Sequence, residues 1–133
     1  MTIETESKER ILEEVKSLIL KYFELMYTND LDLFGRVFDK KAQLYTLSKG
    51  ETLVRTADAY RKILSERTPP KEQGAREENE VFQIDLASET QAFAKVKVRI
   101  NDNVFIDYLT LLRLDGGWRI ASKTYHRVTS AAA

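Results

Sequence analysis

The amino-acid sequence predicts an α+β fold in which helices pack on one face of an antiparallel sheet. Apolar residues recur every three or four positions near the start of the chain, which is the period of an amphipathic helix. From residue 77 onward apolar and polar residues alternate, which is the period of a strand. Helices followed by a run of neighbouring strands are typical of α+β domains.

Three helices are expected, over residues 7–30, 30–39 and 56–67. The first has the strongest pattern, because its apolar residues share one face and charged residues cover the other. The second contains Gly35, which costs about 1 kcal/mol relative to Ala and indicates close packing or a bend. In the third, one apolar face includes Tyr60.

The strands follow from alternation and from turn residues. Residues 42–56 are expected to form a hairpin that turns at Lys49-Gly50. A Pro-rich, charged loop over 68–79 separates this hairpin from the remaining strands. Those strands are expected over residues 81–87, 91–100, 104–114 and 118–128.

Composition fits a globular protein of one domain, residues 1–133, with 1–6 and 129–133 expected to fray. Of the 133 residues, 43% are hydrophobic and 32% charged, and the formal net charge is zero. Zero net charge gives no reason to expect nucleic-acid binding. No apolar run approaches the ~20 residues of a membrane span, and the polar N-terminus is unlike a signal peptide. We expect a cytoplasmic protein that binds neither nucleic acid nor membrane.

The sequence suggests no metal site, no cofactor and no assigned catalytic residue. There is no cysteine, which excludes disulfides, thiolate metal ligands and a cysteine nucleophile. The chain has one histidine, and its carboxylates are scattered, so no metal-ligand spacing is present. Its glycines stand in turns rather than in a phosphate-binding loop.

The final hairpin, residues 107–126, decides where a site could lie. If its turn places Thr110 opposite Ser122, the side chains divide into two sets that face opposite sides of the sheet. We expect one set to face the helices: Ile106, Tyr108, Thr110, Leu112, Trp118, Ile120, Ser122, Thr124 and His126. This assignment assumes the register, since a slip by one residue exchanges the two faces.

The set expected to face the helices is apolar at one end and rich in hydroxyl groups at the other, as the wall of a binding pocket would be. Together with tyrosines from the preceding elements, it gives the expected ligand-binding residues: Tyr22, Tyr45, Tyr60, Tyr108, Thr110, Ser122, Thr124 and His126.

The second set joins Lys95, Lys97 and Arg99 on the expected outer face. There, Asp107 and Lys123 would form a diagonal pair, which we interpret as structural. An apolar patch rimmed by charge usually marks a partner surface. We therefore expect a homodimer through the apolar members of this set: Phe105, Leu109, Leu111 and Tyr125.

Two segments also resemble a known family. The stretch "FIDYLTLLRLDGGWRIASKTYH" carries the more specific match: Asp107, Tyr108, Leu109, Leu111, Asp115, Gly116, Trp118, Ile120, Lys123 and Tyr125. The stretch "FGRVFDKKAQL" adds Phe34, Phe38 and Ala42. Both resemble the NTF2-like superfamily, and within it the SnoaL-like and "putative lumazine-binding" families. The resemblance implies a cone in which a curved antiparallel sheet wraps around three N-terminal helices, with an apolar cavity inside and a tendency to dimerise.

The resemblance leaves three functions open, because superfamily members include enzymes, transport factors and association domains. The first is binding of a small apolar or aromatic molecule in the cavity. The second is an isomerase, dehydratase or cyclase in which His126 acts as the base and a tyrosine stabilises an oxyanion. The third is a non-enzymatic association domain. We favour the first, because His126 lies near a strand end, where a hydrogen-bonded or half-exposed imidazole is the simpler interpretation.

Overall fold

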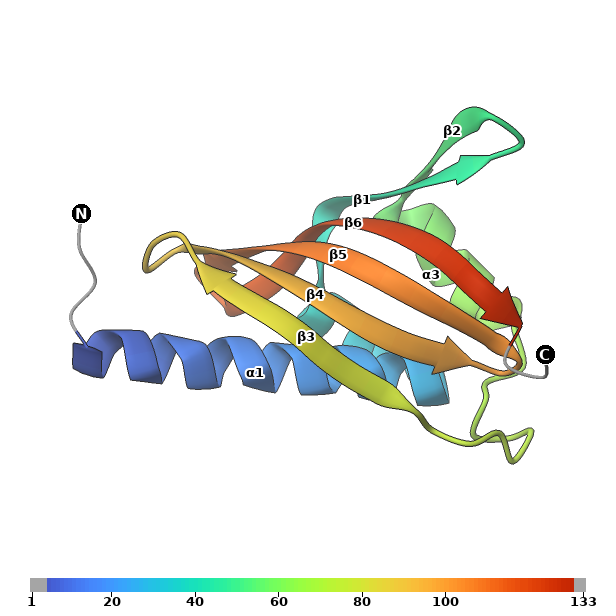
Figure 1. Ribbon diagram of the computed structural model, residues 1–133, viewed down its shortest axis with the longest axis horizontal. Coiled ribbons are helices and arrows are strands. Elements are labelled where there is room, and N and C mark those ends of the chain that lie inside the picture. Colours follow the sequence, from blue (N-terminus) through green and yellow to red (C-terminus); the bar gives the residue numbers. More distant parts are fainter. Residues whose placement is uncertain (1–4, 131–133) are drawn as a thin grey trace.

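The computed structural model describes residues 5–130, and the side chains of residues 7–128. Three helices lie on one side of a six-stranded sheet (Figure 1). In chain order the elements are α1 (Thr5–Thr28), α2 (Leu31–Val37), β1 (Phe38–Ser48), β2 (Glu51–Thr56), α3 (Ala57–Glu66), β3 (Asn79–Leu86), β4 (Gln91–Ile100), β5 (Asn103–Leu114) and β6 (Gly117–Ser130). The predicted fold class and order of elements are confirmed.

The ends expected to fray, 1–6 and 129–133, lie mostly outside the described residues. Residues 5 and 6 belong to α1, and residues 129 and 130 belong to β6.

The strands lie side by side in the order β2-β1-β6-β5-β4-β3. Neighbouring strands run antiparallel, except that β1 runs parallel to β6. The chain therefore places its last strand in the middle of the sheet, between the first hairpin and the meander formed by β3, β4 and β5. One hydrophobic core lies between the sheet and the helices.

Helix ends are set by capping residues. Asp30 and Thr56 are the N-caps of α2 and α3, and each side-chain oxygen accepts a hydrogen bond from a backbone N–H of the first turn, at 3.0 and 3.1 Å. Asn29 follows α1 with a φ of 55°, and its N–H donates to the carbonyl of Leu25 at 2.8 Å. This left-handed residue ends α1 and turns the chain into α2.

Two tight turns fix strand register, and the first is the one expected at Lys49-Gly50. Lys49 and Gly50 have φ values of 52° and 80°, as a two-residue hairpin turn with matching twist requires. The other turn places Ile100 opposite Asn103, and Asn101 within it has a φ of 56°.

The expected facing of the final hairpin is wrong over residues 105–112 and 122–126, where the two sets of side chains are exchanged. Asp107 and Leu109 are fully buried and Lys123 is 4% exposed, whereas Tyr108 is 48% exposed. The side chains of Thr124 and His126 are also exposed. The alternate residues that include Asp107 and Lys123 therefore point toward the helices, and the hydroxyl-rich set points outward.

The exchange follows from the pairing of β4 with β5. The turn at Asn101 puts Ala94 opposite Leu109 and Val96 opposite Asp107. Residues directly opposite each other share a face, so the buried alternation of β4 fixes the buried alternation of β5. Lys95 is correspondingly opposite Tyr108, on the outer face.

A bulge on β6 explains why Trp118 and Ile120 are nevertheless buried as expected. Thr110 pairs with Ser122, as predicted, but Leu111 pairs with Ile120. Ala121 is the extra residue between these pairs, and an extra residue reverses the alternation on the bulged strand. Trp118 and Ile120 consequently share the inner face with Lys123.

As a result, two sets of predicted site residues lie on the opposite face of the sheet from the one expected. Of the expected dimer residues, Leu109 and Leu111 are fully buried in the core, and Phe105 and Tyr125 are partly buried against it. The expected pocket residues of the last two strands lie on the outer face: Tyr108, Thr110, Ser122, Thr124 and His126.

Candidate functional site

A charged pair is buried between the sheet and the helices. Nζ of Lys123 lies 3.9 Å from Oδ2 of Asp107, and the hydroxyl of Tyr22 on α1 donates a hydrogen bond to the same oxygen. The second carboxylate oxygen, Oδ1, is buried without a protein partner among the described residues. Apolar replacements of such pairs are often neutral or stabilising, so the cluster is a candidate functional site rather than an obvious source of stability.

Three tyrosine rings surround the Lys123 ammonium. Nζ lies 5.1 Å from the ring centres of Tyr22 and Tyr60 and 5.3 Å from that of Tyr125, within the range of cation–π attraction. Nζ also lies 3.5 Å from the hydroxyl of Tyr60, which in turn donates to Sδ of Met26 at 3.2 Å. The ammonium is thus held in one place by α1, α3 and β6.

The pKa values of the three groups follow from burial and from one another. Burial raises the pKa of Asp107, and the Lys123 charge and the Tyr22 hydrogen bond offset this only in part. Burial alone would lower the pKa of Lys123, but the attraction of Asp107 and Tyr60 outweighs it, so that pKa is raised. Burial, and then the neighbouring Asp107, raise the pKa of Tyr22. Lys123 is therefore a fixed cation at neutral pH.

A cavity of about 160 Å³ opens next to Lys123, at the end of the sheet covered by α3. Its walls come from β2, α3, the end of β4, the start of β5, and β6. The lining residues are Arg55, Tyr60, Ile63, Arg67, Ile100, Phe105, Lys123 and Tyr125. The cavity therefore combines aromatic and aliphatic walls with three basic side chains.

Hydrogen bonds fix the two arginines at the cavity wall. Nη1 of Arg55 donates to the hydroxyl of Tyr125 at 2.9 Å, and the Tyr125 ring packs edge-on against Phe105. Nη2 of Arg67 donates to Oδ1 of Asn29 at 3.0 Å. The Asn29 amide donates in return to the carbonyls of Leu64 and Arg67, at 3.1 and 2.9 Å. The end of α1 thus holds the end of α3 over the cavity.

The sequence-predicted ligand residues divide between two faces of the sheet. Tyr22 and Tyr60 lie inside, in contact with Lys123. Tyr45 is partly exposed on β1, where its hydroxyl donates to Gln43 at 2.6 Å. The predicted residues of the final hairpin are not in the interior.

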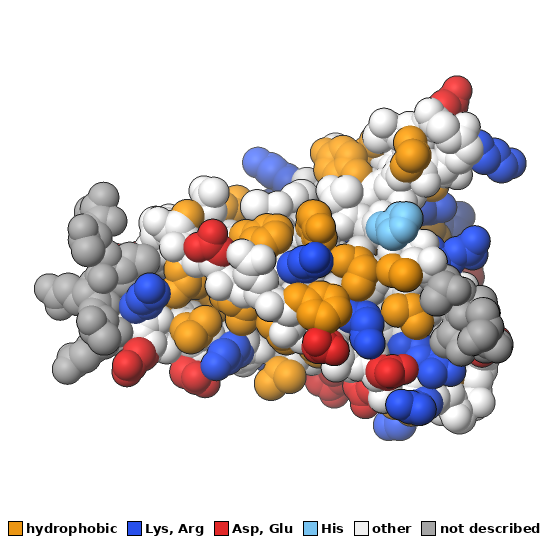
Figure 2. All heavy atoms as spheres, in the orientation of Figure 1, with side chains coloured by type: hydrophobic (Ala, Val, Ile, Leu, Met, Phe, Trp, Pro, Cys, Tyr) orange, Lys and Arg blue, Asp and Glu red, His pale blue; other side chains and the backbone are white. Residues whose placement is uncertain are grey.

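Part of this outer group still meets at one place. Tyr108, Thr124 and His126 line a surface hollow of about 560 Å³, together with Phe82, Lys95, Ile106 and Tyr125. Nζ of Lys95 lies over the rings of Phe82 and Tyr108, at 5.7 and 5.6 Å. Figure 2 shows this face, with hydrophobic side chains gathered around basic ones and the single histidine.

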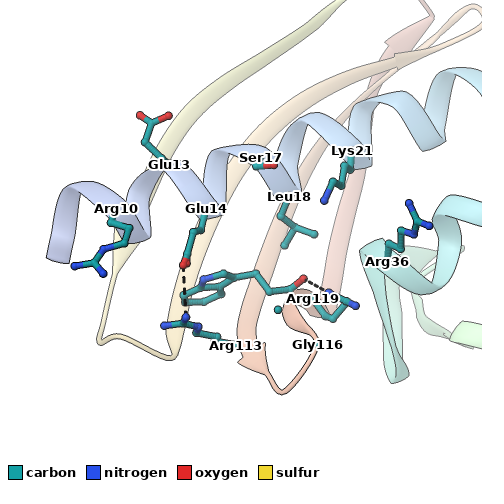
Figure 3. A pocket seen from close by; sticks show the side chains of 12 residues that line it. Arg10, Glu13, Glu14, Ser17, Leu18, Lys21, Arg36, Arg113, Gly116 and Arg119 are labelled. Atoms are coloured by element: carbon teal, nitrogen blue, oxygen red, sulfur yellow. Dashed lines mark hydrogen bonds and ion pairs between the residues drawn. The ribbon is translucent and has the colours of Figure 1, made fainter.

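Another hollow, of about 640 Å³, is a groove between α1 and the β5–β6 turn (Figure 3). Its lining includes five basic residues, but the groove is exposed to solvent. Arg113 pairs with Glu14 at 3.7 Å, and both side chains are partly exposed. Arg119 donates hydrogen bonds to the backbone carbonyls of Trp118 and Gly35, at 2.9 and 3.0 Å. Size alone therefore does not make this groove the site.

Sequence reasoning missed Asp107, Lys123, Arg55 and Arg67 as site residues. A signal for the first two was present in the two-residue turn after Ile100, which pairs even-numbered residues of β4 with odd-numbered residues of β5. The two arginines come from β2 and the end of α3. These elements are far from the final hairpin in sequence, so the sequence gives no sign that they lie close to it in space.

Among residues whose placement is described, no group of three or more His, Asp or Glu side chains could hold a metal ion. No helix within that part of the chain is long and apolar enough to cross a membrane.

Comparison with known proteins gives one family and many similar folds. The family model described as "Putative lumazine-binding" matches residues 10–126. No curated protein sequence matches the chain.

Solved structures of similar fold cover nearly the whole chain. An NTF2-like protein of unknown function from Silicibacter pomeroyi DSS-3 is 23% identical with a TM-score of 0.80, over 96% of this chain and 99% of that one. Another from Shewanella baltica OS155 is 20% identical with a TM-score of 0.77, over 98% and 100%. A ketosteroid isomerase-like protein from Erwinia carotovora atroseptica SCRI1043 is 11% identical with a TM-score of 0.69, over 89% and 96%. Identities this low support the fold alone.

Proposed function

Starting from the fact that this chain belongs to the "Putative lumazine-binding" family and has the NTF2-like fold, we propose that it binds a small, largely apolar or aromatic molecule. The binding site is the cavity beside Lys123. The observation that carries the proposal is the cavity wall, in which Ile63, Ile100 and Phe105 accompany fixed polar groups. Apolar walls with a few convergent polar groups are characteristic of small-molecule sites.

The size of the cavity limits its occupant. Drug-sized ligands occupy pockets of about 300–1,000 Å³, and this cavity has about 160 Å³. That supports an occupant of about one ring.

The geometry favours binding over the alternative in which His126 is a catalytic base. His126 is exposed on the outer face, with the sheet between it and the cavity. Asp107 is fully buried behind Lys123, where a molecule in the cavity does not reach it. Lys123 has a raised pKa and stays protonated, so it is a donor and a charge rather than a base.

The test is a binding screen read by NMR. A set of one-ring molecules, neutral and charged, is added to protein labelled with ¹³C in the isoleucine methyl groups. We expect at least one member to shift the signals of Ile63 and Ile100, which line the cavity. Ile63→Trp fills the space and should abolish the shift of the remaining cavity signal, that of Ile100, whereas Thr124→Trp places the same bulk on the outer face and should leave the shifts of both isoleucines. A screen without any binder at the cavity would contradict the proposal.

The homodimer stays a prediction, but the surface proposed for it changes. Large apolar side chains on the outer face of β3 and β5 are well exposed: Phe82 44%, Tyr108 48% and Leu112 36%. Exposed apolar patches of this kind usually mark a partner surface. We infer that a second copy of the chain packs against this outer face, and not against the buried Leu109 and Leu111.

A further inference from the structure

We propose that the molecule bound beside Lys123 is a single-ring aromatic carboxylate, an inference that rests on the function proposed above. The three basic side chains of the cavity wall, Arg55, Arg67 and Lys123, would hold its carboxylate. The rings and aliphatic side chains between them would hold its aromatic body.

The excess of positive charge in the cavity wall favours an anionic ligand. Among the described residues that line it, three are basic and none is Asp or Glu. Among the described residues, the carboxylate paired with Lys123 is that of Asp107, which is buried behind it and already accepts a hydrogen bond from Tyr22. Two positive charges therefore have no counter-charge at the cavity wall, and partly buried charge is costly until it is paired.

Donors for such an anion remain free. A guanidinium carries five N–H donors and an ammonium three. Arg55 gives one to Tyr125, and Arg67 gives one to Asn29 while its Nε is buried without a partner among the described residues. Arginine forks match the two oxygens of a carboxylate. Because Arg55 comes from β2 and Arg67 from the end of α3, the two guanidinium groups flank the space from different elements.

The rest of the wall suits an aromatic ring. Phe105 and Tyr125 stand edge-on with ring centres 6.0 Å apart, and Tyr60, Ile63 and Ile100 complete the lining. Offset or edge-on ring pairs are favourable in addition to the area they bury. The volume, about 160 Å³, admits one ring with a small substituent.

Benzoate and benzamide test this inference, because they share shape and differ in charge. Calorimetry with the 133-residue chain should show benzoate binding about 10- to 100-fold more tightly than benzamide, the range expected for hydrogen bonds to charged groups. Added salt should weaken benzoate binding and leave benzamide unchanged. Arg55→Gln should reduce affinity for benzoate about tenfold or more. Arg113→Gln, the same change in the groove beside α1, should leave it unchanged.

The experiments distinguish failure of the carboxylate inference from failure of the proposed function. Equal binding of the two probes in the cavity would overturn the carboxylate inference and leave the proposed function standing. Absence of binding by both, with no other binder in the NMR screen, would overturn both. Benzoate binding that responds to Arg113→Gln but not to Arg55→Gln would place the anion in the groove and overturn the inference. Circular dichroism of each variant confirms that it is folded.

Discussion

Lys123 and Asp107 lie diagonally across the paired strands β6 and β5, with Nζ and Oδ2 3.9 Å apart beneath the helices. The same two residues on the outer face would form an ordinary surface pair, worth at most about 1 kcal/mol. In the interior each depends on the other, since Asp107 is fully buried and Lys123 is only 4% exposed.

Removing one member of the pair should therefore be costly. Lys123→Met leaves Asp107 buried without its cation, and we expect the free energy of unfolding to fall by about 3–5 kcal/mol. The double variant Asp107→Asn/Lys123→Met should lose less than the sum of the two single variants, by about 1–3 kcal/mol. Urea unfolding of the four proteins measures this coupling. Additive effects would show that the pair does not interact.

The same substitution should change the dependence of stability on pH. The raised pKa of Asp107 means that the folded state holds this proton more strongly than the unfolded state does, so its contribution to stability falls as pH rises from the usual carboxyl pKa through the raised one. Lys123→Met removes the charge that lowers the pKa of Asp107, so the pKa of Asp107 in the folded state rises further. The pH range over which stability falls then reaches to higher pH. As pH rises above the pKa of Asp107 in the folded wild type, the variant should continue to lose stability after the wild type has levelled off. Parallel pH profiles would contradict this.

Asn29 connects the helix ends that cover the cavity, and replacing it should loosen them. Asn29→Ala loses the three side-chain hydrogen bonds to Leu64 and Arg67 and also strains a backbone with φ of 55°; we expect a loss of about 2–4 kcal/mol. Asn29→Gly loses the same bonds but tolerates the left-handed backbone, so it should cost about 1 kcal/mol less. Thermal unfolding ranks the two variants. Equal midpoints would show that backbone strain is negligible there.

The outer sheet face provides the test of the homodimer. Tyr108→Asp introduces a charge at a side chain that is 48% exposed, and it should shift the protein from dimer to monomer while leaving it folded. Leu109→Asp, one residue away but fully buried, should instead unfold the protein, because an unpaired carboxylate in the core is costly. Light scattering after size exclusion gives the mass of each variant. A dimer that survives Tyr108→Asp would place the interface elsewhere.

Much of the fold could be predicted because each element depends on local patterns. Residues 91–100, for example, alternate so regularly that β4 begins and ends where expected. The inner facing of β5 and β6 could not be predicted from charge, because Lys123 and Asp107 are buried against the usual preference of their residue types. The pairing across Asn101 was the better guide, since geometry fixes the facing of paired residues and composition does not.

Of the candidate site, only Tyr22 and Tyr60 were predicted as ligand residues. Tyr22 and Tyr60 lie on apolar helix faces, so their inward direction follows from periodicity. Arg55 and Arg67 reach the cavity through the packing of the first hairpin and α3 against the end of the sheet, which depends on contacts far apart in the sequence.

The extra residue at Ala121 also affects how this chain should be compared with its relatives. A relative without the bulge would carry, at the columns after this position, side chains that face the opposite side of the sheet. An ungapped sequence alignment would then match the buried lysine of this chain with a surface residue of the relative. Structure-based superposition of β6, with a gap allowed at Ala121, is therefore the sound basis for deciding which relatives carry the buried ammonium.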